Sequence, residues 1–142
     1  MPIAGIDFGR KRIGLAISDG RGAYPIGIIE RRSLKHDLEA IRSRMADRHV
    51  SLIVVGLPLN MDGTEGPSAR AARAFAERVG AATGLPVEMF DERLTSFEAR
   101  DRLEDLPVGK GKRKTGIDAL AAVVILEGWM QAHGDKIPPA PS

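Results

Sequence analysis

Hydrophobic residues occur in short runs over the first 31 positions, and charged or glycine-rich turns separate these runs. The runs at 2–8, 12–18 and 24–31 have the length and the residue types of β-strands. Residues 9–11 and 19–22 join them, and connections this short place consecutive strands side by side in antiparallel order. The first part of the chain therefore predicts a three-stranded meander.

From residue 34 the spacing of hydrophobic positions changes to that of an α-helix, as in Leu34, Leu38, Ile41 and Met45. Strands and helices then alternate. We expect a helix at 34–49, a strand at 51–56, a helix at 67–83, a strand at 87–90, a helix at 95–106, a basic loop at 109–114 and a last helix capped by Thr115. This order predicts an α/β fold with a mixed five-stranded sheet and helices on both faces.

Length and composition limit the possible classes of protein. The 142 residues suit one domain, which we assign to residues 1–133, and the proline-rich residues 134–142 predict a disordered tail. The absence of cysteine excludes thiol catalysis, disulfides and thiolate-bound metals. The longest wholly apolar run, 119–126, is too short to span a membrane, and the N-terminus lacks the basic start of a signal peptide. We therefore expect a cytoplasmic protein without membrane contact.

Charge alone does not indicate a nucleic-acid partner, because 21 Lys and Arg residues against 19 Asp and Glu residues leave a net charge of only +2. The basic residues are clustered, however, at 10–12, 31–32 and 110–114, and such clusters can bind phosphates. Solvent-exposed loops would produce the same pattern. The aromatic residues are few and scattered, which disfavours binding of nucleic acid chiefly by base stacking.

Asp7 is the first candidate for chemistry, because it interrupts an otherwise hydrophobic strand on the face of Ile3 and Gly5. A carboxylate in that position is costly unless it is paired, hydrogen-bonded or bound to a metal ion. The structural alternative is that Asp7 caps the turn at 9–11.

Further acidic candidates occur at the ends of predicted elements. Asp91 and Glu92 end the fifth strand, where ligands bind in open sheets, and they point to opposite faces, so we expect only one of them in a site. A polar strand exit with Arg93 paired to a neighbour would explain the same residues. Asp118 lies at the border of the apolar face of the last helix, but Thr115 and Asp118 also match a capping box.

Asp7, the strand-end acid and Asp118 would form an oxygen-rich site for Mg²⁺ or Mn²⁺ if the fold brought them together. Two such ions can activate water and stabilise the leaving oxygen of a phosphodiester. The spacing along the chain does not by itself establish that the acids converge.

Four segments resemble motifs of the YqgF/RuvX family: residues 5–16 (GIDFGRKRIGLA), 55–63 (VGLP and NMDG), 91–96 (DERLTS) and 114–126 (with DALAA). They span nearly the whole chain in the family's order. The resemblance implies an RNase H-like fold and a metal-dependent nuclease, described in this family either as a Holliday junction resolvase or as a pre-16S rRNA processing nuclease. It also implies that the catalytic and metal-binding acids are Asp7, Glu92 and Asp118.

We therefore expect an endonuclease that acts on structured nucleic acid, at the 5′ end of pre-16S rRNA, on Holliday junction DNA, or on both, as a monomer or weak homodimer. Six basic side chains are then expected to contact nucleic acid: Arg10, Arg12, Arg93, Lys112, Arg113 and Lys114. Arg93 could instead orient Glu92. Two alternatives are a nucleic-acid-binding factor without catalysis and an actin-like nucleotide-binding fold, although the chain is too short for the second domain that encloses a nucleotide.

Overall fold

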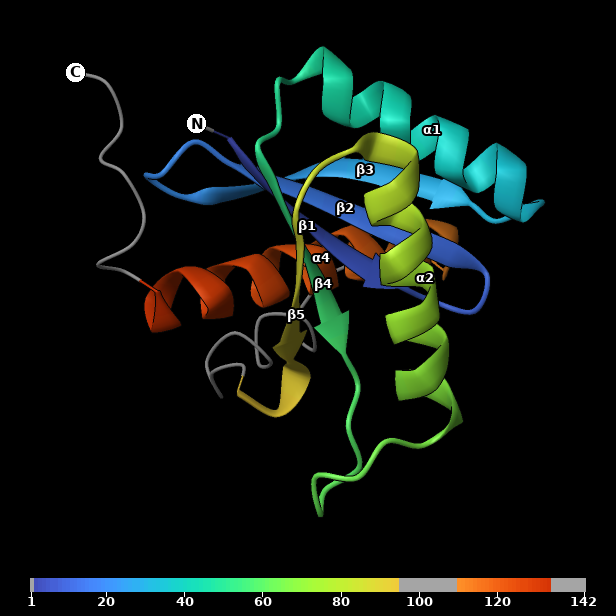
Figure 1. Ribbon diagram of the computed structural model, residues 1–142, viewed down its shortest axis with the longest axis vertical. Coiled ribbons are helices and arrows are strands. Elements are labelled where there is room, and N and C mark those ends of the chain that lie inside the picture. The colour runs from blue at the N-terminus through green and yellow to red at the C-terminus, as the bar shows by residue number, and fades with distance from the viewer. Residues whose placement is uncertain (1, 95–109, 134–142) are drawn as a thin grey trace.

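A mixed five-stranded sheet forms the centre of the computed structural model, with the strand order β3-β2-β1-β4-β5 (Figure 1). The structure describes residues 2–94 and 110–133, without the side chains of 110–118. In chain order the elements are β1 (Ile3–Phe8), β2 (Arg12–Ser18), β3 (Ala23–Glu30), α1 (Leu34–Asp47), β4 (Leu52–Leu57), α2 (Pro67–Thr83), β5 (Val87–Asp91), the 3₁₀ turn η1 (Glu92–Leu94) and α4 (Lys110–Ala132).

The direction of the strands brings three of their ends together. β1, β2 and β3 form the predicted antiparallel meander, in which Ile3 pairs with Ser18 and Arg12 pairs with Glu30. β4 pairs in parallel with β1, and β5 pairs in parallel with β4. Parallel neighbours need crossover connections, which α1 and α2 supply. The C-terminal ends of β1, β4 and β5 therefore lie at the same edge of the sheet.

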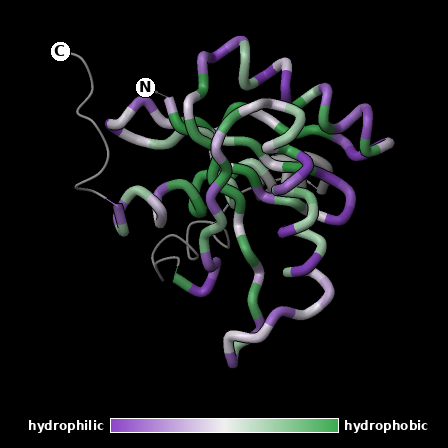
Figure 2. The backbone as a smooth tube through the Cα atoms, viewed as in Figure 1, coloured by the Kyte–Doolittle hydropathy of each residue, from purple (hydrophilic) through white to green (hydrophobic). Residues whose placement is uncertain are grey.

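The helices form two layers, with α1 and α2 on one face of the sheet and α4 on the other (Figure 1). Because side chains alternate along a strand, each face has its own hydrophobic core. Ile6 and Val55 pack under α1 and α2, whereas Val54 and Phe90 pack under α4. Figure 2 shows the hydrophobic segments concentrated in the central strands. Among the described residues, no helix is both long and apolar enough to cross a membrane.

Two strand glycines allow α4 to pack directly against the sheet. A Cβ atom on Gly5 of β1 would lie 2.8 Å from the backbone oxygen of Ala122, and a Cβ atom on Gly56 of β4 would lie 2.5 Å from Cδ1 of Ile125. Both distances are well below ordinary carbon contacts of about 3.5–4.0 Å. Only glycine therefore permits this approach of α4 to β1 and β4.

The sequence predictions and the structure differ mainly at the start of α4. Residues 110–114, predicted as a basic loop, form the first turns of this helix, so Thr115 lies inside it and does not cap it. Lys and Arg are good helix formers, but Gly111 and Gly116 each cost a helix about 1 kcal/mol, so local propensity alone does not distinguish a loop from a helix here. The hydrophobic pattern also does not predict η1. The other described elements begin and end within two residues of their predicted bounds. The helix expected at 95–106 and the tail at 134–142 lie outside the described residues.

Candidate active site

Two of the predicted acids lie where three parallel strands end. The last paired residues of β1 and β4 are Ile6 and Val55. The next residue on each of these neighbouring strands is Asp7 on β1 and Gly56 on β4. Gly56 pairs in turn with Phe90 of β5, and Glu92 follows Phe90 by two residues. In open α/β sheets, ligands bind outside the carboxyl ends of the strands. The edge that carries Asp7 and Glu92 is therefore the candidate active site.

Asp7 lies on the α4 side of the sheet and is half-buried. The alternation of β1 directs Ile6 into the core under α1 and α2 and directs Gly5 towards α4, so Asp7 shares the face of Gly5. Its pairing partner on β2 is Gly14, which has no side chain to fill the space beside the carboxylate. This is the face that the sequence pattern predicts for Asp7.

Glu92 begins η1, and its carboxylate extends over β4. The carboxyl carbon of Glu92 lies 3.1 Å from the position that a Cβ atom on Gly56 would occupy, next to the side chain of Ile125 from α4. Glu92 is therefore on the α4 side of the sheet, like Asp7. Since neighbouring strands are about 4.8 Å apart, the two carboxylates border the same space.

The third predicted acid, Asp118, belongs to α4. Its backbone lies one helical turn before Ala122, whose carbonyl oxygen is the closest neighbour of a Cβ atom built on Gly5. The side chain of Asp118 lies outside the described part of the structure, so its convergence with Asp7 stays a prediction. Among the side chains that are described, no group of three or more His, Cys, Asp and Glu residues could hold a metal ion.

Asp91 and Arg93, the two neighbours of Glu92 in the chain, form an ion pair. Nε of Arg93 donates to both carboxylate oxygens of Asp91 at 3.1 Å, and Nη2 donates to Oδ2 at 2.8 Å. Nη1 donates to the carbonyl oxygen of Met61 at 3.2 Å. The hydrogen bonds from Arg93 hold the pKa of Asp91 below its ordinary value. This is the pairing that the sequence leaves open as an alternative. Within the described residues, the pairing with Asp91 engages two of the five N–H groups of Arg93, and the bond to Met61 engages a third.

Arg10 lies on the turn from β1 to β2, and Arg12 is the first residue of β2. Arg10 is exposed, whereas Arg12 is half-buried and its Nε has no hydrogen-bond partner in the described part of the chain. Sequence reasoning misses the contribution of Arg31, since nothing in the pattern distinguishes it from its basic neighbours. Nη1 of Arg31 donates to the carbonyl oxygens of Gly9 and Arg10 at 3.0 Å, and its guanidinium lies 4.4 Å from the ring centre of Phe8. Both Arg10 and Arg31 line a hollow of about 250 Å³ next to the start of α2.

The other three predicted basic residues are Lys112, Arg113 and Lys114, in the first turns of α4. They precede Asp118 by about one to two helical turns. Their side chains are not among those described, and their contact with phosphates stays a prediction.

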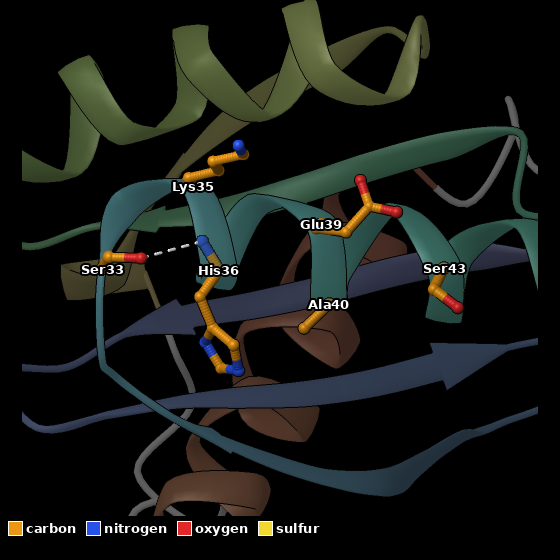
Figure 3. Close-up of a pocket in the computed structure, with 6 residues that line it drawn as sticks. All are labelled: Ser33, Lys35, His36, Glu39, Ala40 and Ser43. Atoms are coloured by element: carbon orange, nitrogen blue, oxygen red, sulfur yellow. Dashed lines mark hydrogen bonds between the residues drawn. The ribbon is translucent and has the colours of Figure 1, made fainter.

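A larger hollow of about 540 Å³ lies along α1, on the face of the sheet opposite to α4 (Figure 3). Its lining includes Ser33, His36 and Glu39. Ser33 Oγ accepts a hydrogen bond from the backbone N–H of His36, and Glu39 pairs with Arg42, so these polar groups serve the helix itself. Because α1 and α4 pack on opposite faces of the sheet, this hollow contributes nothing to the acidic edge.

The similarity to known families covers almost the whole chain. Residues 1–132 match the model of the RuvX family, which is described as Holliday junction resolvase. The chain belongs to the RuvX family. This is a family of nucleases, hydrolases that act on phosphodiester bonds.

Curated relatives of this RuvX chain have nearly the same length. A protein named "Putative pre-16S rRNA nuclease" from Anaeromyxobacter dehalogenans (strain 2CP-C) is 53% identical over 132 residues, which cover 92% of this chain and 96% of the relative. A protein of the same name from Myxococcus xanthus (strain DK1622) is 44% identical over 135 residues, 94% of this chain and 89% of the relative.

Two solved structures share the fold of the RuvX chain at low sequence identity. RuvC of T. thermophilus in complex with a Holliday junction substrate has a TM-score of 0.55 and 16% identity, and the match covers 93% of this chain and 96% of RuvC. The fowlpox virus resolvase with its substrate Holliday junction DNA has a TM-score of 0.56 and 12% identity, with 93% and 98% covered. These matches confirm the predicted α/β, RNase H-like fold.

Proposed function

We propose that this chain is a metal-dependent endonuclease that cleaves structured nucleic acid, either the 5′ end of pre-16S rRNA or Holliday junction DNA. The observation that carries the proposal is that Asp7 and Glu92 share one face of the sheet at the ends of parallel strands. Membership of the RuvX family and the names of the relatives support it. The substrate is therefore a nucleic acid with a branch, a loop or an end.

The donor atoms at the acidic edge fit a divalent cation. Nucleases of this kind generally use a divalent metal ion, and carboxylate oxygens are the ligands that Mg²⁺ and Mn²⁺ prefer. Asp7 and Glu92, with Asp118 as the third acid, would hold the ion. The missing side chain of Gly56 provides the space beside the Glu92 carboxyl group. A bound ion would activate water and stabilise the leaving oxygen of the phosphodiester.

The basic residues supply the complementary charge for the substrate. Two groups of basic side chains would contact phosphates on either side of the scissile bond. The first is Arg10 and Arg12, at the start of β2, and the second is Lys112, Arg113 and Lys114, at the start of α4. Arg93 restrains the backbone that carries Glu92 through its ion pair with Asp91. Two of its five N–H groups make no hydrogen bond within residues 2–94 and 110–133, and these two would donate to a phosphate.

The decisive variant is Asp7→Asn, which keeps the shape of the side chain and removes one charge. We expect cleavage to fall by roughly a thousandfold or more, because the metal contributes several kcal/mol to the transition state. Without metal, the variant should be as stable as wild type or about 1 kcal/mol more stable, since repulsion between neighbouring carboxylates is relieved. Added Mn²⁺ should raise the melting temperature of wild type more than that of the variant.

Asp19→Asn is the matched control. Oδ1 of Asp19 accepts a hydrogen bond from the backbone N–H of Arg21 in the β2–β3 turn, so Asp19 has the role that the structural alternative assigns to Asp7. The control should cleave like wild type. A destabilised but fully active Asp7→Asn protein would mean that Asp7 only caps a turn. Binding of nucleic acid without any cleavage by wild type would favour a factor without catalysis.

Junction DNA and precursor rRNA, assayed side by side with Mg²⁺ and with Mn²⁺, identify the substrate. The proposal requires that at least one of them is cut and that EDTA abolishes the reaction.

A further inference from the structure

Met61 is the most exposed of the large hydrophobic side chains in the described residues. It is 92% exposed, compared with 64% for Leu94 and 56% for Tyr24. Met61 belongs to residues 58–66, the connection from β4 to α2, which extends well beyond the ends of the strands (Figure 1). Removing an apolar side chain from water is favourable. A methionine held in solvent beside the acidic edge is therefore suited to contact the substrate.

Hydrogen bonds within residues 60–64, which we call the Met61 turn, hold its conformation. Asn60 N donates to the carbonyl oxygen of Thr64, and Asn60 Nδ2 donates to Thr64 Oγ1, both at 2.9 Å. Asp62 Oδ1 accepts from the backbone N of Thr64 at 3.0 Å and from its hydroxyl at 2.6 Å. Gly63 adopts φ +88°, a conformation that favours glycine. Because the backbone of the Met61 turn is preorganised, little backbone freedom is lost when it binds a partner.

The Met61 turn is also hydrogen-bonded to the segment that carries Glu92. The carbonyl oxygen of Met61 accepts a hydrogen bond from Nη1 of Arg93 at 3.2 Å, while the other side of the same guanidinium is paired with Asp91. Since Glu92 lies between Asp91 and Arg93 in the chain, one ion pair restrains both Glu92 and Met61. At the other end of the connection, Glu65 forms an ion pair with α2 at 3.0 Å. These contacts restrain the position of the Met61 turn relative to the acidic edge.

We propose that Met61 is a wedge that inserts between two bases of the substrate where their stacking is interrupted. This inference rests on the nuclease function proposed above. A thioether side chain carries no charge for a phosphate, but it is polarizable and adapts to irregular apolar surfaces such as the faces of bases. Apolar side chains, methionine among them, unstack base steps in this way in architectural DNA-binding proteins.

The wedge would account for the proposed preference for structured nucleic acid. Unstacking costs least where a base is mismatched or already unpaired, as at a branch or beside a loop. An inserted Met61 therefore binds a branch point more readily than a continuous duplex. An inserted Met61 would also position the branch point relative to the acids, because Arg93 hydrogen-bonds to the Met61 turn and adjoins Glu92 in the chain.

The test follows one base with 2-aminopurine, whose fluorescence rises when it leaves the stack. The probes are a four-way DNA junction labelled beside the branch, a precursor-rRNA stem labelled beside its loop, and continuous duplexes with the same labels. Binding is measured in EDTA with Met61→Ala and with Met61→Leu, which keeps an apolar side chain. Tyr24→Ser is the matched control, because it changes another exposed side chain near the start of β3. β3 is the outermost strand on the side of the sheet away from β5.

We expect wild type, Met61→Leu and Tyr24→Ser to raise the fluorescence of at least one interrupted probe and not of its duplex. Met61→Ala should bind without this rise, and with Mg²⁺ or Mn²⁺ it should cleave the interrupted substrate about tenfold more slowly. Its thermal stability should equal that of wild type, because the side chain is exposed. Asp62→Ala removes the oxygen that accepts hydrogen bonds from the backbone N and the hydroxyl of Thr64. This variant should show a smaller fluorescence rise than wild type.

The outcomes separate the wedge from the nuclease proposal. If Met61→Ala unstacks the probe and cleaves like wild type, the wedge is refuted and the nuclease proposal stands. If the fluorescence rise depends on Met61 but wild type cleaves no substrate with either metal, the nuclease proposal fails and the wedge stands. If Met61→Ala leaves the fluorescence unchanged and instead abolishes self-association or binding of a protein, Met61 belongs to a protein interface and the wedge is overturned.

Discussion

The substitution Gly56→Ala tests whether the close packing of β4, Glu92 and α4 supports activity. The added Cβ would lie 2.5 Å from Cδ1 of Ile125 and 3.1 Å from the carboxyl carbon of Glu92. Restoring contacts of about 3.5–4.0 Å requires Ile125 to move by about 1 Å and Glu92 by about 0.5 Å. Ile125 is buried, so it has no free space into which to turn.

The expected loss of stability follows from two opposing effects. Overpacking of a core costs about 1–3 kcal/mol, whereas replacing Gly by Ala in a strand restricts the unfolded chain and contributes about 0.4–1 kcal/mol of stability. The net destabilisation of Gly56→Ala should therefore be about 1–2 kcal/mol. A misplacement of about 1 Å at a catalytic group can cost about a hundredfold in rate. We expect Gly56→Ala to cleave between about tenfold and a hundredfold more slowly.

Two other glycines calibrate this experiment, in which guanidinium denaturation and cleavage are measured on each variant. A Cβ atom on Gly80 of α2 would lie 3.5 Å from Val87, an ordinary contact, so Gly80→Ala should raise stability by up to about 1 kcal/mol and leave cleavage unchanged. A Cβ atom on Gly5 would meet the backbone of α4 at 2.8 Å, and backbone yields less readily than a side chain. Gly5→Ala should therefore lose more stability than Gly56→Ala, about 3 kcal/mol.

The result that would refute this reasoning is wild-type cleavage by a Gly56→Ala protein that shows the expected loss of stability. The loss of stability would confirm that α4 packs against β4. The unchanged cleavage would show that the position of Glu92 over Gly56 is irrelevant to the reaction. Unchanged stability would contradict the packing of α4 itself.

Two further predictions concern charge. Replacing Lys112, Arg113 and Lys114 together by Ala should weaken binding of nucleic acid. The slope of log K against log salt should become shallower by about 0.9 for each lost phosphate contact on duplex DNA, or by about 0.7 on single strands. An unchanged slope would mean that the start of α4 is not part of the interface. Hydrogen bonds from Arg73 lower the pKa of Glu65 in the folded protein, so this pair contributes stability above the unfolded pKa of about 4.3 and loses it as the pH falls through the folded pKa. Acid titration of stability should therefore be slightly shallower for Glu65→Gln than for wild type, and equal slopes would mean that solvent screens the pair completely.

Local pattern was sufficient to predict most of the elements. The strand at 12–18 and the helix at 67–83 have the predicted bounds, because their signals lie in neighbouring residues. Pro67 suits the first turn of a helix, and Gly84 takes the left-handed conformation that ends one. The start of α4 was harder to predict, since a run of basic residues with glycines suits a loop and a helix alike.

The candidate acids also followed partly from the sequence. Asp7 is conspicuous because a carboxylate in a hydrophobic strand needs a partner, and strand alternation predicts the face on which it lies. The positions of Asp91, Glu92 and Asp118 at the ends of elements made them candidates, and the resemblance to a family selected Glu92 and Asp118 as the companions of Asp7. Alternation also separates Asp91 from Glu92, and the structure gives Asp91 to Arg93.

Only the tertiary structure decided which residues meet across the sheet. No local signal shows that Gly56 of β4 provides the space for Glu92 of η1, or that Arg93 reaches the carbonyl oxygen of Met61. These contacts depend on the order β1-β4-β5 and on the parallel register of three strands that are far apart in the chain. Hydrophobic periodicity reports which face of an element is buried, but it carries no information about which other element covers that face.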